Sequence, residues 1–158
     1  PLLITIPDFW NGTVRPEWDE LLLECEKKQI DIHIDFAWLI MSRHIELDLS
    51  HPCIKSFAMS LSKYGMQWNR VGLRWTKQRT MDSITIYNHY YEGMNTGIYS
   101  VGNYLCNTIE RDHLWNTYAD KNAEICRQVG AEQTKFIHAV KLPEDPSRLY
   151  GIAKILEQ

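Results

Sequence analysis

The chain has 158 residues, 44% of them hydrophobic, and a formal net charge of −3 at pH 7. These values are typical of one globular domain with a hydrophobic core, and they argue against nonspecific nucleic-acid binding. No apolar run approaches membrane-spanning length and no signal peptide opens the chain, so no membrane association is predicted. The four cysteines are widely spaced without a CxxC pair, which indicates free thiols in a reducing, cytoplasmic compartment: Cys25, Cys53, Cys106 and Cys126.

The first part of the chain predicts a strand, a helix and a second strand. Residues 2–6 are apolar and β-branched, and the turn residues of 7–13 predict a loop after them. Residues 15–29 begin with a proline and acids and place apolar residues at helical spacing. Residues 32–38 form the next strand. This order indicates a βαβ unit in a parallel sheet, where ligands bind beyond the carboxyl ends of the strands.

A third predicted strand leads to a lysine. Residues 54–59 are apolar or small except for Lys55 and Ser56, and they deliver Lys63 into a turn marked by Gly65. A lysine at the end of a core strand is costly unless it is paired or uncharged. One chemical use of such a lysine is a Schiff base with an aldehyde cofactor, because a desolvated amine is more nucleophilic. The alternative is an exposed turn lysine without a chemical role.

Three strand ends are expected to converge around this lysine. Asp35 lies near the end of the second strand, and Arg70 precedes a further strand at residues 71–75. A pyridoxal phosphate (PLP) site needs this set of groups. Lys63 would carry the aldehyde, Asp35 would keep the pyridinium nitrogen protonated, and Arg70 would hold the phosphate as a bidentate donor.

Three segments of the chain, in this order, resemble the fold-type I PLP enzymes, the aspartate aminotransferase superfamily. They are Asp35-Phe36-Ala37-Trp38, Ser60-Leu61-Ser62-Lys63 and Asn69-Arg70-Val71-Gly72. They are similar to the family's Asp-x-Ala-Tyr, Ser-x-Ser-Lys and Arg-(Val/Ile/Leu)-Gly segments. The resemblance implies that Lys63 is catalytic, as general base and acid at the α-carbon of an amino substrate, and that Asp35, Ser60 and Arg70 hold the cofactor. Ser60 has a second interpretation as a strand-end cap.

Two positions depart from the family pattern. Trp38 stands where the family has a tyrosine that donates to the cofactor's phenolic oxygen; its indole N–H can donate instead, or Trp38 packs in the core. The family's loop after the first strand carries an asparagine that bonds the cofactor's ring oxygen. Asn11 is the best chemical match for it, whereas Asp8 fits the spacing to Asp35 better. Asn11-Gly12 is also consistent with a simple turn.

A metal-dependent hydrolase is an alternative, because His33 and Asp35 share one face of a strand. Further polar groups follow in the segment 41–51: His44, Glu46, Asp48 and His51. No compact ligand spacing such as H-E-x-x-H occurs, and the segment is equally consistent with a solvated connecting loop. No metal is therefore predicted.

The second part of the chain begins with an aromatic-rich segment, residues 83–91. The expected elements after it are a helix at 98–109, a long amphipathic helix at 112–129 ending at Gly130, a strand at 134–142, a turn at 143–146 and a short strand or helix at 149–156. In the resembled family, a long helix leads to a small domain that supplies an arginine for the substrate carboxylate. Arg148 is the late candidate, although its surroundings do not match that motif.

The predicted fold is α/β, with a mostly parallel sheet flanked by helices. Residues 1–110 are expected to form part of a large PLP-binding domain, and residues 111–158 a linker helix and part of a small C-terminal domain. The Gly-rich phosphate loop and the cofactor-stacking aromatic of the family are not found, so the resemblance covers its second half only.

The predicted function is that of a PLP-dependent aminotransferase acting on a small-molecule amino substrate, as a homodimer or paired with a chain that carries the missing half. The rival prediction is a non-catalytic scaffold or interaction module. It would bind a partner through an exposed sheet edge or through the aromatic face around residues 87–99.

Overall fold

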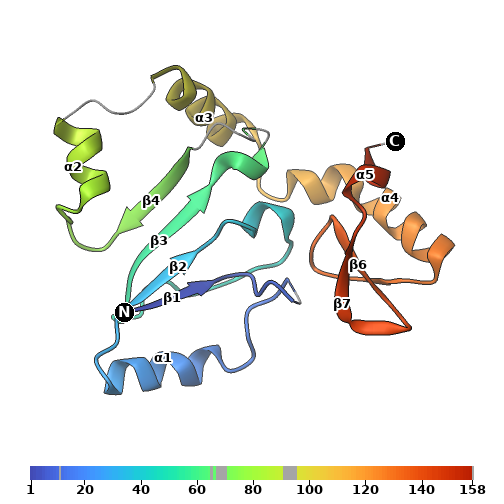
Figure 1. The fold of residues 1–158 in the computed structure, drawn as a ribbon, viewed down its shortest axis with the longest axis horizontal. Coiled ribbons are helices and arrows are strands. Elements are labelled where there is room, and N and C mark those ends of the chain that lie inside the picture. Colours follow the sequence, from blue (N-terminus) through green and yellow to red (C-terminus); the bar gives the residue numbers. More distant parts are fainter. Residues whose placement is uncertain (11, 65, 67–70, 91–95, 158) are drawn as a thin grey trace.

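The computed structural model describes residues 1–10, 12–64, 66, 71–90 and 96–157. Within these ranges the chain forms two sheets flanked by helices, one with strand order β1-β2-β3-β4 and one with order β5-β6-β7 (Figure 1). No helix in these ranges is long and apolar enough to cross a membrane. All four cysteines are free, as predicted, with Cys106 exposed and the others buried.

The larger sheet consists of β1 (Leu2–Thr5), β2 (Ile32–Asp35), β3 (Ile54–Ser60) and β4 (Gly72–Thr76). The first three strands pair in parallel, and β4 runs antiparallel to β3. Helix α1 (Trp18–Lys27) connects β1 to β2. The predicted βαβ unit and the predicted mostly parallel sheet are therefore confirmed.

Alternation of side chains divides the larger sheet into an apolar and a polar face. Ile32 and Ile34 are almost fully buried and belong to one core cluster with Trp18 and Leu22 of α1. Burial of each isoleucine stabilises the fold by about 1.5–3 kcal/mol. Because neighbouring residues in a strand point to opposite faces, His33 and Asp35 lie on the other, polar face.

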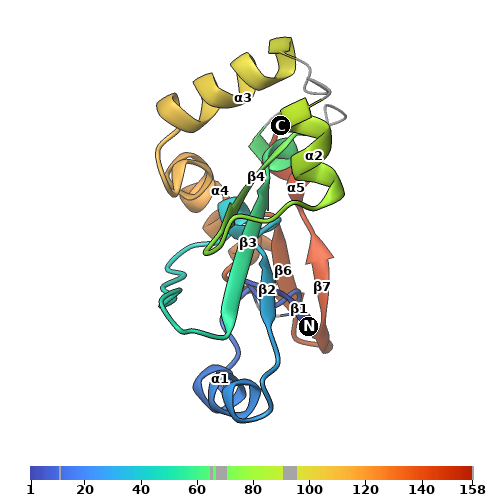
Figure 2. The same ribbon diagram turned by 90° about the vertical axis from the view of Figure 1, so that its left-hand side faces the viewer.

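Two helices carry the chain from β4 to the C-terminal part, α2 (Ser83–Tyr90) and α3 (Thr96–Thr108). Figures 1 and 2 place α1 and α3 on opposite sides of the larger sheet. The long helix α4 (His113–Val129) follows, and Gly130 ends it in the left-handed conformation with φ of 67°. The predicted helices and the predicted stop at Gly130 agree with this course of the chain.

The predicted strand at 134–142 is wrong in its first half. The strands here are β5 (Glu132–Gln133), β6 (Ala139–Leu142) and β7 (Asp145–Gly151). Residues between β5 and β6 form a turn, because the Thr134 hydroxyl accepts the Phe136 N–H (3.1 Å) and donates to the Ala139 carbonyl (2.7 Å). The hydrogen bonds of the Thr134 hydroxyl thus take the place of the backbone hydrogen bonds that a strand would form here. The last element, expected as a strand or a helix, contains both, with α5 (Ala153–Leu156) after β7.

The C-terminal part docks beside the carboxyl ends of β1 and β2, which point toward β6 and β7 in Figure 1. Ser42, at the end of the short helix η1 (Leu39–Met41), forms an antiparallel bridge with Phe136. The Ile137 N–H donates to the Met41 carbonyl at 2.9 Å, and the Arg43 N–H donates to the Lys135 carbonyl at 3.3 Å. These bonds hold the turn before β6 against the end of η1, the short helix that follows β2.

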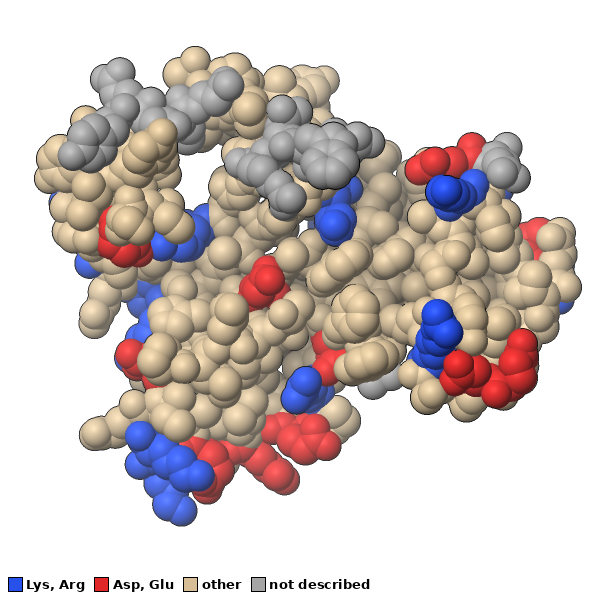
Figure 3. All heavy atoms as spheres, in the orientation of Figure 1, with Lys and Arg blue, Asp and Glu red and all other residues tan. Residues whose placement is uncertain are grey.

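A second buried cluster, which includes Trp115, Ile125 and Val140, forms the core of the C-terminal part. The division of the chain into residues 1–110 and 111–158 stays a prediction. In the face shown in Figure 3, basic and acidic side chains are interspersed, in keeping with the small net charge of −3.

Candidate functional site

The candidate site lies at the carboxyl edge of the parallel strands. Asp35 is the last residue of β2 and Ser60 the last of β3, and Lys63 follows in the short helix η2 (Leu61–Tyr64). Asp35 pairs in register with Ala58 of β3, so the ends of the two strands are neighbours. Ligands bind at this edge in sheets of this kind.

The start of β4 meets the end of β3 at the same edge. Gly72 pairs with Ser60, and the Leu61 N–H donates to the Val71 carbonyl at 3.0 Å. A Cβ atom on Gly72 would lie 2.7 Å from the Met59 carbonyl oxygen, so only glycine allows this approach of the two strands. Arg70 immediately precedes this segment but lies outside the described residues, so its place in the site stays a prediction.

Lys63 lies over the indole of Trp38. Its Nζ atom is 4.4 Å from the centroid of the Trp38 ring, and both side chains are half-buried. A cation over an aromatic face gains about 0.5–1 kcal/mol when exposed and more when water is excluded. The structure therefore brings together the predicted catalytic lysine and the predicted Asp35–Trp38 segment, and Lys63 is not an exposed turn lysine.

Asp35 is half-buried and shapes the turn that presents Trp38. Its Oδ1 accepts the Ala37 N–H at 2.8 Å. Asp35 and Ser60 also line one shallow cavity of about 360 Å³, together with small residues such as Ala58 and Gly72. Asp35 and Ser60 therefore share the wall of one cavity, whereas Lys63 and Trp38 lie outside its lining.

The Ser60 hydroxyl is engaged locally. It forms a hydrogen bond of 2.7 Å with the Ser62 hydroxyl and accepts the Ser62 N–H at 3.2 Å. This is the geometry of the strand-end cap, the second interpretation given to this serine. Contact of Ser60 with a cofactor phosphate stays a prediction.

Sequence reasoning missed two aromatic residues of the site, which come from the turn before β6. The His138 ring stacks on Trp38, with centroids 5.4 Å apart and 13° between the planes. Phe136 contacts Trp38 edge to face at 6.1 Å. Burial, and then the positive charge of Lys63, lower the pKa of His138 below its usual 6.5. The sequence holds no signal for this contact, because it depends on how the C-terminal part docks.

The loop after β1 holds both candidates for the contact with the cofactor's ring oxygen, Asn11 and Asp8. Asn11 lies outside the described residues, so its role also stays a prediction. The alternative, Asp8, is paired with Arg15 at 2.9 Å and accepts the Trp10 N–H at 2.8 Å. Both contacts are local to the loop. The Phe9 ring lies 6.2 Å from that of Trp38 and extends the aromatic surface.

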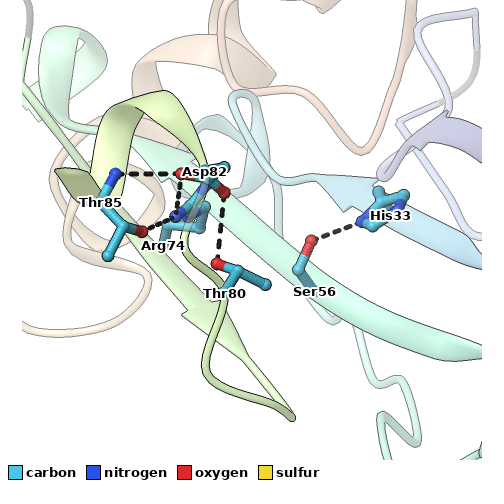
Figure 4. Close-up of polar contacts among 6 residues, drawn as sticks. All are labelled: His33, Ser56, Arg74, Thr80, Asp82 and Thr85. Atoms are coloured by element: carbon cyan, nitrogen blue, oxygen red, sulfur yellow. Dashed lines mark hydrogen bonds and ion pairs between the residues drawn. The ribbon is translucent and has the colours of Figure 1, made fainter. Parts of the chain in front are cut away.

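Arg148 lies on β7, where its guanidinium contacts the Tyr150 ring at 5.3 Å. This contact within the strand gives no support to the role of a carboxylate-binding arginine. The metal alternative gains no support either, since the described residues contain no group of three or more His, Cys, Asp or Glu side chains arranged to hold a metal. His33 instead shares a hydrogen bond of 2.7 Å with the Ser56 hydroxyl (Figure 4).

A second cavity, of about 510 Å³, lies near the amino ends of β2 and β3, away from Lys63. Its wall includes Arg74, which binds both carboxylate oxygens of Asp82 at 2.7 and 3.2 Å (Figure 4). Arg74 also donates to the Thr85 hydroxyl at 2.8 Å. The Arg74 guanidinium and the Thr85 N–H hold the pKa of Asp82 well below its usual range. These contacts anchor α2 to β4.

No protein-family model and no curated protein matches the chain. Among solved structures, an aspartate aminotransferase from Thermotoga maritima is similar, with a TM-score of 0.62 and 18% identity over 89% of this chain and 42% of that one. A probable N-succinyldiaminopimelate aminotransferase from Thermus thermophilus has a TM-score of 0.57 and 17% identity over 90% and 44% of the two chains. The chain thus spans less than half of either protein. The likeness concerns the fold, and the aminotransferase fold predicted from the three motifs is confirmed.

Proposed function

We propose that this chain forms part of a PLP-dependent aminotransferase site, in which Lys63 binds the cofactor as a Schiff base and acts on an amino acid or another amino substrate. The observation that carries the proposal is the position of the Lys63 amine. The amine lies 4.4 Å from the centroid of the Trp38 ring, and the half-buried Lys63 follows the strand next to the one that Asp35 ends. The aminotransferase fold supports the same conclusion.

The residues at this edge fit PLP. Asp35 supplies an acid for the pyridine nitrogen, and Ser60 supplies a hydroxyl for the phosphate, on the wall of one cavity. The small residues Ala58 and Gly72 line the same cavity. When bound, PLP supplies an electron-accepting ring that stabilises negative charge at the substrate's α-carbon.

The chain's own residues would divide the remaining work. Asp35 would hold a proton at the pyridine nitrogen, and Lys63 Nζ would take a proton from the α-carbon and return one. The Trp38 face holds that amine in place, which is a requirement for efficient proton transfer. The Ser60 hydroxyl can donate to the phosphate while it accepts the Ser62 N–H and the Ser62 hydroxyl. Three further contacts are proposed from the sequence resemblance alone. They are Arg70 with the phosphate, Asn11 with the ring oxygen, and the Trp38 indole N–H with the phenolic oxygen.

The proposal includes a partner, either a second copy of the chain or a chain that carries the rest of the fold. Two observations support it. The chain covers 42–44% of the similar structures, and β1 and β4 are the outer strands of the described sheet. Outer strands present backbone groups that another strand can pair with. A cytoplasmic location is proposed from the free cysteines.

The test is the visible absorbance spectrum after addition of PLP, followed by borohydride reduction and mapping of the modified lysine by mass spectrometry. The expected result is a reducible band in the wild type, absent in Lys63→Ala. Lys27→Ala is the matched control, because that side chain is 77% exposed on α1 and should keep the band. An equal band in Lys63→Ala, or modification spread over exposed lysines, would contradict the proposal.

A second candidate function is an interaction module without catalysis. The aromatic side chains of α2 and α3 favour it, since Tyr87, Tyr90, Tyr99 and Tyr104 are between 49% and 65% exposed. A large exposed apolar surface usually marks a contact with another protein. Two results together would favour this function over the first. One is the absence of any Lys63-specific PLP band, and the other is self-association in sedimentation that Tyr90→Ser and Tyr104→Ser abolish.

A further inference from the structure

His138 is held firmly in the turn before β6. Its carbonyl accepts the Ile152 N–H at 2.8 Å, and the neighbouring Ile137 N–H donates to the Met41 carbonyl at 2.9 Å. Ile137 and Ala139, on either side, are 2% and 3% exposed, and Ile137 belongs to the C-terminal core. The backbone around His138 is thus anchored to the C-terminal part and to the segment after β2.

The His138 side chain contacts the site of Lys63 instead of a polar partner. Its ring lies parallel to Trp38, with centroids 5.4 Å apart, and tilted against Phe136 at 5.3 Å. Phe136 in turn contacts the edge of Trp38. Three rings in mutual contact restrict the rotation of each, because a turn of the indole would clash with the other two.

The surroundings of the His138 ring disfavour its charged form. Its Nδ1 atom is buried without a hydrogen-bond partner among the described residues, so a proton there would lack an acceptor among them. The Lys63 ammonium also opposes a second positive charge, and together with burial it lowers the pKa of His138. A neutral ring can lie beside both the indole and the lysine.

We propose that His138 is a positioning residue of the Lys63 site: by stacking on Trp38, it fixes the indole face on which the Lys63 amine lies. The distance of 4.4 Å from Lys63 Nζ to the Trp38 centroid depends on the orientation of that ring. The C-terminal part thereby completes a site whose other members come from the ends of β2 and β3. The inference rests on the proposed function for the use of the amine, whereas its test needs no cofactor.

The test reads the position of the Lys63 amine directly. Reductive methylation with ¹³C-formaldehyde keeps each lysine charged and adds methyl groups that are visible by NMR. Methyl groups above an indole face resonate upfield, so the Lys63 signal is expected upfield of that of Lys27, which is 77% exposed. Loss of a signal in Lys63→Arg assigns it, and Trp38→Leu gives the position without the ring.

In His138→Ala, the Lys63 signal is expected to lose more than half of its upfield shift, whereas His138→Phe, which keeps a flat ring, should retain most of it. A Lys63 signal that stays in place in a folded His138→Ala protein would overturn the inference. If that variant does not fold, the inference is tested instead by NMR of the wild-type protein. Cross-relaxation between the ring protons of His138 and Trp38 supports the stack, and its absence refutes it.

The outcome is separable from that of the proposed function. A Lys63 shift that depends on His138, without a PLP band, would leave the positioning role intact and refute the cofactor. A Lys63-dependent PLP band with an unchanged Lys63 shift in His138→Ala would support the cofactor and refute the positioning role of His138.

Discussion

Replacement of Gly72 by alanine should force β3 and β4 apart at the end nearest to Lys63. The new Cβ atom would lie 2.7 Å from the Met59 carbonyl oxygen, whereas ordinary contacts begin at 3.4 Å. The difference of about 0.7 Å must come from the backbone, because the obstructing atom is a carbonyl oxygen and not a flexible side chain. The pairing of Gly72 with Ser60 brings the displacement to the end of β3, three residues before Lys63.

The magnitude follows from two opposing effects. Overpacking of this kind costs about 1–3 kcal/mol, whereas replacing glycine with alanine reduces the entropy of the unfolded chain and recovers about 0.4–1 kcal/mol. The net loss in the free energy of unfolding therefore lies between about 0 and 2.6 kcal/mol, with a midpoint of about 1.3 kcal/mol. In a protein of this size, that loss lowers Tm by about 2–4 °C for each kcal/mol.

The assay is urea denaturation of Gly72→Ala beside Gly151→Ala. Gly151 is the matched control, because it also lies in a strand, yet a Cβ atom there would have no neighbour within 4 Å. Because nothing opposes the entropic gain at this position, Gly151→Ala should be more stable than the wild type by about 0.4–1 kcal/mol. Equal stability of the two variants would refute the argument from the 2.7 Å approach. The Lys63-dependent PLP band should also weaken in Gly72→Ala but not in Gly151→Ala.

Three further predictions concern single side chains. Asn122→Ala should lower the free energy of unfolding by about 1–3 kcal/mol in urea denaturation, because the Asn122 amide donates to the buried Ile137 carbonyl at 2.8 Å; an unchanged urea midpoint would contradict this. The Arg74–Asp82 pair should contribute stability that is fully present above the usual carboxyl pKa of 3.8 and is lost as the pH falls through the lower folded pKa, so Tm between about pH 2 and 6 should depend less on pH in Asp82→Asn. The unfolded chain protonates His138 at about 6.5, before the folded protein does, so stability should decline as the pH falls through that value, and His138→Phe should flatten this part of the Tm profile.

Local signals in the chain were sufficient for much of the fold. The apolar spacing of α1 agrees with the burial of Trp18, Leu22 and Cys25. The left-handed Gly130 ends α4 where a glycine stop was expected. Order along the chain also predicted that Asp35 and Lys63 lie at one edge, because parallel neighbouring strands must end together. Each of these features depends on periodicity, on a single backbone conformation or on strand direction, which a sequence displays directly.

Other features depend on contacts between distant segments. The Thr134 hydroxyl turns the chain away from the predicted strand, since it satisfies two backbone groups that a ladder would otherwise pair. Helix α2 is anchored by the Arg74–Asp82 contact, which no hydrophobic pattern indicates. Likewise, the sequence left open whether Lys63 lies in an exposed turn or is half-buried. The position of Trp38 against the Lys63 amine decided this.

The motifs around Asp35 and Lys63 were therefore readable from the order of residues, since a motif is a local property of the chain. The surroundings of the lysine were not, because His138 lies 75 positions beyond Lys63 and reaches it only through the docking of the turn before β6 on η1. Docking of that kind depends on the fit of two packed surfaces. No single stretch of sequence contains that information, and so the aromatic stack beside the candidate catalytic lysine emerged only from the folded chain.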